Sequence, residues 1–139
     1  MNQTAPLLLL RDLVCGYQEQ KVVQELNLHL KQGDIGCLLG PSGCGKTTTL
    51  RAIAGFEPVQ AGAIELNGDV ISKAGFTLAP EKRRIGMVFQ DYALFPHLSV
   101  EDNVAFGIHR DPQAARITAE LLDLVKLGAS ATVFCGVYL

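Results

Sequence analysis

The stretch Gly40-Pro41-Ser42-Gly43-Cys44-Gly45-Lys46-Thr47 decides how the rest of this sequence is interpreted. It matches the pattern GxxxxGK[ST] and stands between an apolar run, Ile35–Leu39, and a stretch with helical spacing, Thr47–Ala54. Glycines let successive backbone N–H groups curve around an anion without a Cβ in the way, and a helix N-terminus adds unpaired donors. The pattern therefore predicts a phosphate-binding loop between a buried strand and a helix.

Two side chains at the end of this stretch have separate expected roles. Lys46 can place a positive charge beside the β- and γ-phosphates of a nucleotide, and the Thr47 hydroxyl can complete the ligand shell of Mg²⁺. A simple glycine-rich turn is the alternative, but such a turn has no use for a lysine followed by a threonine. The motif indicates a nucleotide and leaves the reaction open, because kinases, GTPases and transport ATPases all carry it.

The remaining periodicity is typical of a mixed α/β chain. The predicted strands are Leu7–Val14, Val22–Leu30, Ile35–Leu39 and Ile85–Phe89, and the predicted helices are Thr47–Ala54, Val100–Ile108 and Pro112–Leu127. Ile35–Leu39 is nearly all apolar, as expected of a strand buried on both faces of a parallel sheet. Asn67-Gly68 predicts a hairpin, and Gly55 is a natural end for the first helix. In the last helix, apolar residues stand at helical spacing at Ile117, Leu121, Leu124 and Val125.

Composition excludes several classes of protein. The 139 residues suffice for one domain or a piece of one, and 48% hydrophobic with 19% charged residues is typical of a soluble globular chain. Twelve Lys and Arg against 14 Asp and Glu leave a net charge of −2, which argues against direct binding of nucleic acid. The apolar runs are too short to span a bilayer, and the N-terminus has no secretory signal pattern.

The four cysteines are Cys15, Cys37, Cys44 and Cys135, and they are predicted to be reduced thiols. None stands in a CxxC pair and no histidine lies at zinc-ligand spacing, so a metal cluster is not expected. Cys37 lies in an apolar run and is predicted to fill the core. The basic run Lys82-Arg83-Arg84 is predicted to be a solvated surface without a catalytic role.

Three longer stretches resemble the N-terminal half of an ATP-binding cassette (ABC) transporter ATPase. They are GPSGCGKTTTLRAIAGFE, GAIELNGDVI and EKRRIGMVFQDYALFPHLSVEDNVAFGI, and their order and spacing are similar to the family from Leu7 to about Leu127. Within this family, the sequence most resembles the ATPases of bacterial importers for ferric iron and related small solutes. The resemblance implies an α/β fold, with a P-loop NTPase core of a mainly parallel sheet and flanking helices and an N-terminal antiparallel β subdomain. Relative to the family, this domain is expected to be incomplete.

The resemblance also implies a site for ATP and Mg²⁺. Tyr17 matches the aromatic residue that stacks on adenine. Gln90 matches the glutamine that reaches Mg²⁺ or the attacking water, so Lys46 and Gln90 are the implied catalytic residues and Thr47 and Gln90 the implied Mg²⁺ contacts. The residues expected to contact the nucleotide are Tyr17, Gly40, Pro41, Ser42, Gly43, Cys44, Gly45, Lys46, Thr47 and Thr48.

Partners and location follow from the same resemblance. The segment from about Gln90 to Val100, which includes Phe95, Pro96 and His97, matches the region that touches the permease membrane subunits. In the family a second ATPase subunit completes a head-to-tail dimer. The implied location is peripheral, at the cytoplasmic face of the inner membrane, or in the cytoplasm for the chain alone.

The sequence departs from the family near its end. Residues 1–128 are expected to be the N-terminal part of a nucleotide-binding domain, and residues 129–139 a divergent tail. The signature motif LSGGQ, Walker B, the D-loop and the switch histidine are missing; Leu121-Leu122-Asp123 imitates Walker B, but its surroundings are helical. We therefore expect a truncated or frame-shifted product that binds ATP without hydrolysing it alone, and that is poorly stable because Ile35–Leu39 lacks a neighbouring strand.

Two other functions remain open from the sequence. One is a non-catalytic fragment that binds nucleotide or docks on the permease. The other is a different P-loop enzyme such as a small kinase, for which Arg110 and Arg116 are too sparse to form a lid.

Overall fold

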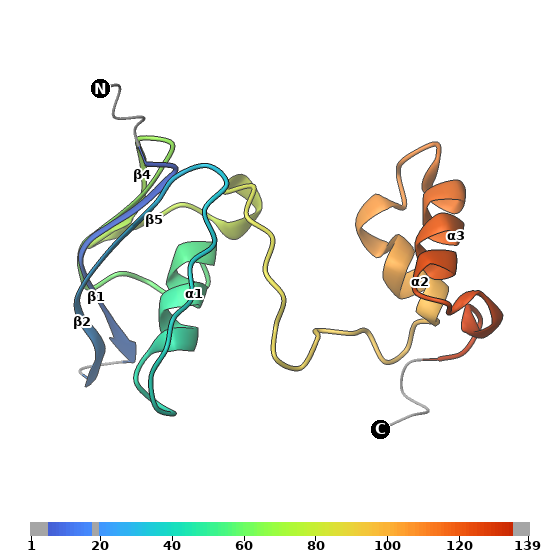
Figure 1. Ribbon diagram of the computed structural model, residues 1–139, viewed down its shortest axis with the longest axis horizontal. Coiled ribbons are helices and arrows are strands. Elements are labelled where there is room, and N and C mark those ends of the chain that lie inside the picture. The colour runs from blue at the N-terminus through green and yellow to red at the C-terminus, as the bar shows by residue number, and fades with distance from the viewer. Residues whose placement is uncertain (1–5, 18–19, 135–139) are drawn as a thin grey trace. The chain divides into compact units, whose positions relative to one another are not determined.

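The chain divides into two compact units, residues 1–87 and residues 88–139 (Figure 1). The structure is a computed structural model that describes residues 6–17 and 20–134. Within those ranges, no helix combines the length and the apolar character that crossing a bilayer requires.

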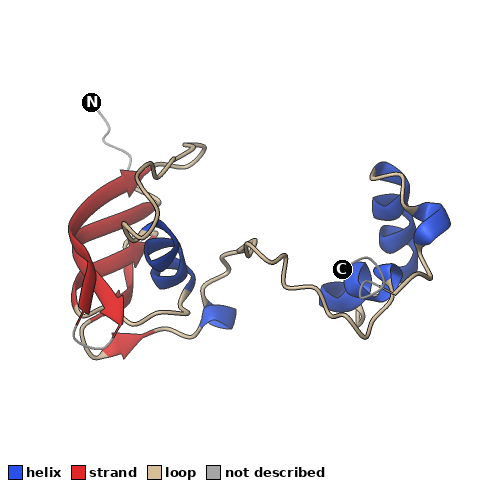
Figure 2. Cartoon of the chain, turned by 90° about the horizontal axis from the view of Figure 1, so that it is seen from below, coloured by secondary structure: helices blue, strands red, loops and turns tan. Residues whose placement is uncertain are grey.

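The first unit is built on an antiparallel sheet with one helix against a face of it (Figure 2). Its elements are β1 (Leu8–Tyr17), β2 (Gln20–Leu30), α1 (Lys46–Ala54), β3 (Ala61–Leu66), β4 (Asp69–Lys73), β5 (Phe76–Thr77) and the 3-10 helix η1 (Pro80–Lys82). The five strands lie in the order β2-β1-β3-β4-β5, and every neighbouring pair is antiparallel. The predicted N-terminal antiparallel subdomain is confirmed.

Glycine chemistry explains two of the turns. Asn67 and Gly68 have φ angles of 53° and 87°, as a type I′ hairpin turn requires, and they join β3 to β4 as predicted. Gly55, with φ 96°, ends α1 in the left-handed conformation, and its N–H donates to the carbonyls of Arg51 and Ala52.

The core of the first unit lies where the sheet meets α1. Its buried members are Leu10, Leu13, Cys15, Val23, Ala52, Val59, Ile64 and Ile71. Burial, with the Glu57 carboxylate adding to it, raises the pKa of the Cys15 thiol to about 11, so this thiol stays protonated at neutral pH. Cys37 is exposed, and the prediction that it fills the core is wrong.

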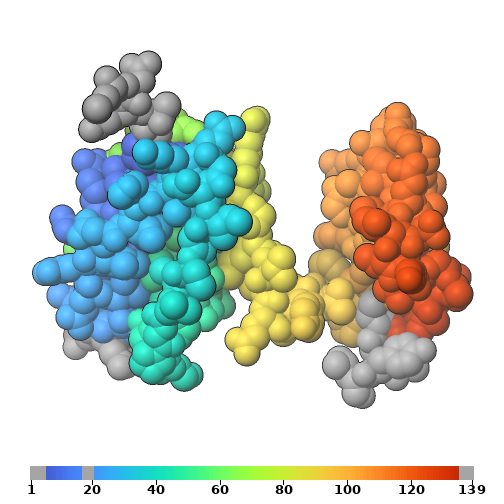
Figure 3. Space-filling view, in the orientation of Figure 1, coloured from blue at the N-terminus to red at the C-terminus, as the bar shows by residue number. Residues whose placement is uncertain are grey.

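The predicted parallel sheet is not found among the described residues. Ile35–Leu39 and Ile85–Phe89 have no regular secondary structure, so the prediction of strands there is wrong. A strand needs a neighbour that completes its hydrogen-bond ladder, and none of the five strands pairs with either segment. Ile35 is 98% and Leu39 is 87% exposed, and their segment (cyan) lies on the face of the first unit shown in Figure 3.

The second unit is helical. Its elements are α2 (Val100–Ala105), the 3-10 helix η2 (Phe106–Ile108), α3 (Ala114–Leu124) and the 3-10 helix η3 (Gly128–Ser130). Both predicted helices are confirmed. The first is α-helical only to Ala105 and continues as the 3-10 helix η2, and the second is shorter at each end.

Two devices satisfy the free amides at the start of α2. The Ser99 Oγ accepts from the Asp102 N–H at 3.0 Å and donates to the Asp102 carboxylate at 2.7 Å, which resembles a capping box. The N–H groups of Val100 and Glu101 donate to the carbonyls of Val133 and Ala131, both at 2.9 Å. Residues 131–133 therefore belong to the packing of this unit.

The face of α3 that is buried is not the apolar face that the sequence indicated. Thr118 and Leu122, one turn apart, are its buried residues, whereas Leu124 is 76% and Val125 58% exposed. The helix is apolar on more than one side, and its packing against α2 uses only one of them.

Arg83 corrects the interpretation of the basic run. Lys82 and Arg84 are exposed as predicted, but Arg83 is buried and donates hydrogen bonds to carbonyls of α1 and β4. A Cβ on Gly55 would lie 2.6 Å from the Arg83 Nε, so glycine is required there for space as well as for its positive φ. Burial lowers the pKa of the Arg83 guanidinium.

Gly55→Ala should therefore cost more stability than an ordinary glycine replacement at positive φ. We expect a loss of about 2–5 kcal/mol in the free energy of unfolding, the sum of left-handed backbone strain and overpacking against Arg83. Gly68→Ala is the matched control, because Gly68 has φ 87° and a Cβ on it would meet nothing within 4 Å. Urea denaturation measures both, and equal losses would contradict the steric role of Gly55.

Candidate phosphate-binding site

The loop 40–45 leads directly into the N-terminus of α1. Gly43 and Gly45 have φ angles of 82° and 95°, in the left-handed region that glycine adopts without strain. Gly45 is the N-cap residue of α1, and no side chain caps the first turn. The first amides of the helix and its positive dipole end are therefore available to an anion.

Strand β2 supports this loop. A Cβ on Gly45 would lie 2.6 Å from the Val23 Cγ2 and 3.2 Å from the Val22 carbonyl oxygen, so only glycine permits this approach. The carbonyl of Gly45 accepts from the N–H of Thr49 at 2.8 Å and from its hydroxyl at 2.9 Å. The loop is thus held on one side by the sheet and on the other by the helix.

The Lys46 side chain curls back over the loop. Its Nζ donates to the carbonyls of Gly40 at 2.8 Å and Pro41 at 2.7 Å, and it lies 3.6 Å from the Cys44 Sγ. These contacts keep the ammonium at the loop, close to the free amides of α1. A phosphate bound there would meet backbone donors and a positive charge together.

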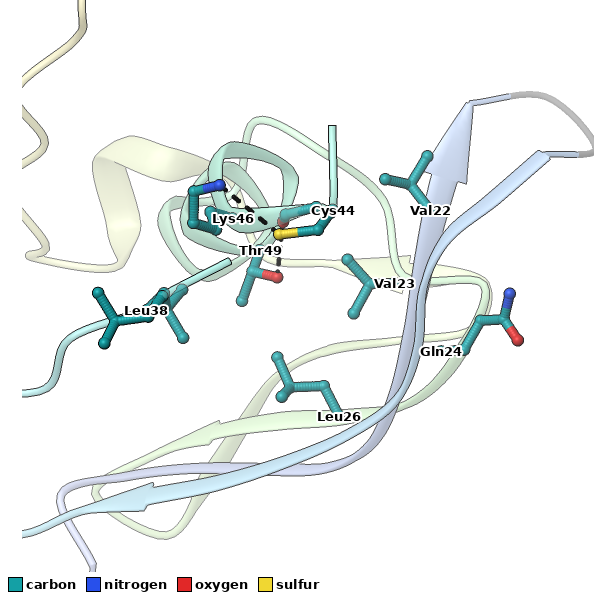
Figure 4. A pocket seen from close by; sticks show the side chains of 10 residues that line it. Val22, Val23, Gln24, Leu26, Leu38, Cys44, Lys46 and Thr49 are labelled. Carbon is teal, nitrogen blue, oxygen red and sulfur yellow. Dashed lines mark hydrogen bonds between the residues drawn. The ribbon is translucent and has the colours of Figure 1, made fainter. Parts of the chain in front are cut away.

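A pocket of about 200 Å³ lies beside the loop (Figure 4). Val23 and Leu26 of β2 point toward the side that carries Cys44, Lys46 and Thr49, whereas Gln24 points away. The complete lining is Val22, Val23, Gln24, Leu26, Leu38, Leu39, Cys44, Gly45, Lys46 and Thr49. An apolar wall next to a cation suits a ligand with both an apolar part and an anionic part.

The first unit holds most of the predicted site residues. Residues 40–47 form the loop and the first helical turn, with Thr47 exposed. Thr48 is buried in α1, and its contact with a nucleotide stays a prediction. Tyr17 is the last residue of β1, but its side chain lies outside the described residues.

Gln90 belongs to the second unit, where it is an exposed turn residue. Its predicted role in catalysis and Mg²⁺ contact stays a prediction. The segment that follows includes Tyr92, 74% exposed, and Leu94, 54% exposed.

Asn103 holds part of that segment in shape. Its Oδ1 accepts from the Phe95 N–H at 2.9 Å, and its Nδ2 donates to the carbonyls of Phe95, Leu98 and Ser99 at 2.9–3.3 Å. The Phe95 ring also packs against Phe106 with centroids 4.3 Å apart. The segment 95–98 is therefore an ordered loop whose backbone is held by the hydrogen bonds of Asn103.

Sequence reasoning missed Val23, Arg83 and Asn103. An asparagine inside a helix is unfavourable because its amide competes for backbone groups, and this was a usable signal for Asn103. No comparable signal separated Arg83 from the two exposed basic residues beside it.

Comparison with known proteins decides the family. A family model described as "ABC transporter" matches residues 23–134 of the chain. The chain belongs to the ABC transporter family. The resemblance drawn from the phosphate-binding motif and its flanking stretches is confirmed.

Three relatives in this family illustrate the match. The chain is 47% identical over 131 residues to the spermidine/putrescine import ATP-binding protein of Hahella chejuensis, covering 91% of this chain and 35% of that protein. It is 50% identical over 111 residues to a sulfate/thiosulfate import ATP-binding protein of Chromobacterium violaceum, covering 78% and 29%. It is 52% identical over 112 residues to the Fe(3+) ions import ATP-binding protein of Fusobacterium nucleatum, covering 80% and 29%. The chain thus spans about a third of the length of these ABC transporter relatives.

The hydrogen bonds of Asn103 generate a prediction for the loop 95–98. Asn103→Asp keeps the size of the side chain but removes the donor to three carbonyls, so this loop should open more often. We expect the Leu98 amide, which donates to the Phe95 carbonyl within this loop, to exchange its hydrogen roughly 5- to 150-fold faster, since losing these partly buried hydrogen bonds costs about 1–3 kcal/mol. Asn67→Asp makes the same chemical change at an exposed turn and should leave that amide unaffected. Unchanged exchange in Asn103→Asp would show that the loop does not depend on Asn103.

Proposed function

We propose that this chain is the nucleotide-binding part of an ABC importer ATPase subunit, and that it binds ATP with Mg²⁺ at residues 40–48. The observation that carries the proposal is the uncapped N-terminus of α1 with the Lys46 ammonium held at the same loop. Membership of the ABC transporter family and three relatives described as import ATP-binding proteins support it.

The residues have distinct roles in this proposal. The amides of the loop and of the first turn of α1 bind phosphate oxygens, and Lys46 neutralises their charge. Thr47 is exposed at the start of the helix, and its hydroxyl oxygen is a ligand of the hard kind that Mg²⁺ prefers. When bound, Mg²⁺ would neutralise part of the negative charge of the phosphates. Tyr17 is proposed to stack on adenine, and Gln90 is proposed to reach Mg²⁺ or the attacking water, as the family resemblance implies.

Hydrolysis by these 139 residues alone is proposed to be near background. Phosphoryl transfer depends on positioning and charge stabilisation. The sequence contains neither the LSGGQ signature nor a Walker B carboxylate pair, and these supply the remaining groups in the family. A non-catalytic nucleotide-binding or permease-docking fragment is the alternative form of the same proposal.

The transported molecule is proposed only as a small solute. The names of the relatives mention polyamines, sulfate or thiosulfate, and ferric ions, so ferric iron is one choice among several. The proposed partners are permease membrane subunits, contacted by residues from about Gln90 to Val100, and a second ATPase subunit. The proposed location is the cytoplasmic face of the inner membrane, as a peripheral protein.

Lys46→Ala tests the nucleotide site. We expect the affinity for ATP with Mg²⁺, measured by isothermal titration calorimetry, to fall roughly 10- to 150-fold, because a hydrogen bond to a charged group contributes about 1.5–3 kcal/mol. Lys31→Ala removes an exposed lysine outside the loop and should leave the affinity unchanged. Wild-type chain that shows no ATP binding at millimolar nucleotide would refute the proposal.

Turnover is a separate measurement on the same proteins. A steady-state rate of order 1 s⁻¹ from the wild-type chain, abolished in Lys46→Ala, lies at the low end of ordinary enzymes and would falsify the proposal of near-background hydrolysis.

A further inference from the structure

Arg83 joins three segments of the first unit through one planar group. Its side chain is 2% exposed and donates all five of its N–H groups. Nη1 donates to the Ala52 and Ile53 carbonyls at 2.9 Å each, Nη2 to the Ile71 carbonyl at 3.1 Å and the Ser72 Oγ at 2.7 Å, and Nε to the Leu78 carbonyl at 2.7 Å. Because the guanidinium is rigid, the end of α1 and strand β4 cannot move apart without breaking these bonds.

The helix connects Arg83 to the phosphate-binding loop. Ala52 and Ile53 lie in the last turn of α1, and Gly45 and Lys46 lie at its first. A helix of nine residues is about 13 Å long and behaves as a short stiff rod. Where its C-terminal end is fixed, the direction of the free amides at its N-terminal end is fixed as well.

Apolar packing of the C-terminal end of this helix is limited to small side chains and to Ile53, which is partly buried against the core. The buried side chains of α1 are small, namely Thr48, Thr49, Ala52 and Ala54, and Leu50 is half exposed. Small side chains bury little apolar area, whereas hydrogen bonds from a buried cation are stronger than neutral ones. The positive charge also lies at the helix C-terminus, where the helix dipole favours it. Arg83 is thus the main polar anchor of this end of α1 among the described residues.

We propose that Arg83 is a positioning residue for nucleotide binding. By holding the C-terminal end of α1 against β4, it keeps the loop at the other end in the geometry that receives phosphates. Arg83 acts through Ala52 and Ile53, about a helix length from the phosphates. The inference rests on the proposed function, since it needs a nucleotide at residues 40–48.

The test separates positioning from stability by comparing three ligands. Arg83→Lys keeps the charge but offers three donors in place of five. At a temperature where the variant is folded, its affinities for ATP with Mg²⁺ and for inorganic tripolyphosphate should fall roughly 2- to 30-fold, the usual range for a residue that acts at a distance. Its affinity for adenosine, which does not use the loop, should be unchanged.

Leu10→Ala is the control for lost stability. Leu10 is fully buried in β1, in the core that α1 joins through Ala52, and it forms no part of the Arg83 network, so its truncation destabilises the unit while the five Arg83 hydrogen bonds remain. Folded Leu10→Ala should bind tripolyphosphate as the wild type does. Equal losses in Leu10→Ala and Arg83→Lys, or wild-type tripolyphosphate affinity in Arg83→Lys, would overturn the inference.

A second variant keeps the question answerable if Arg83→Lys does not fold. Ser72→Ala retains Arg83 and removes one of its five acceptors, so tripolyphosphate affinity should fall roughly twofold relative to the wild type, the lower end of the range expected for Arg83→Lys. Unchanged affinity in Ser72→Ala would then overturn the inference while leaving the proposed function intact. Wild-type chain that binds neither ATP nor tripolyphosphate would instead remove the proposed function, and this inference with it.

Discussion

The first unit depends on a buried cation that is satisfied by backbone carbonyls and one hydroxyl. Among the described residues, no carboxylate pairs with Arg83. Such a cation is tolerable inside a protein only when every donor has an acceptor, because an unpaired buried charge is costly. The Arg83 guanidinium therefore fixes the positions of α1, β4 and the segment around Leu78 relative to one another. A short helix with a small apolar surface acquires a defined orientation in this way.

The N-terminal end of α1 is also held in a defined position, here by a close contact that only glycine permits. Gly45 lets the chain pass close to Val22 and Val23 of β2 directly before the first turn of the helix, whose amides no side chain caps. The helix is thus held by a close backbone approach at one end and by a guanidinium at the other. Both constraints are steric or polar, and neither depends on the exposed apolar segment 35–39.

Local signals in the sequence predicted local structure well. The hairpin at Asn67-Gly68, the end of α1 at Gly55 and the loop before Lys46 follow from backbone preferences of a few neighbouring residues. The strands expected at Ile35–Leu39 and Ile85–Phe89 depended on partners elsewhere in the chain, and periodicity contains no information about partners. The burial of Arg83 was unpredictable for the same reason, because its acceptors are up to 31 residues away in sequence.

The hydrogen bonds that Val100 and Glu101 make to Val133 and Ala131 also bear on how shorter versions of the polypeptide should be designed. A fragment that stopped at Leu124, where α3 ends, would leave two amides at the start of α2 without their acceptors. Water would have to replace them, and the entry of the chain into that helix would fray. The practical boundary of the helical unit therefore lies at or beyond Phe134, ten residues after its last α-helix.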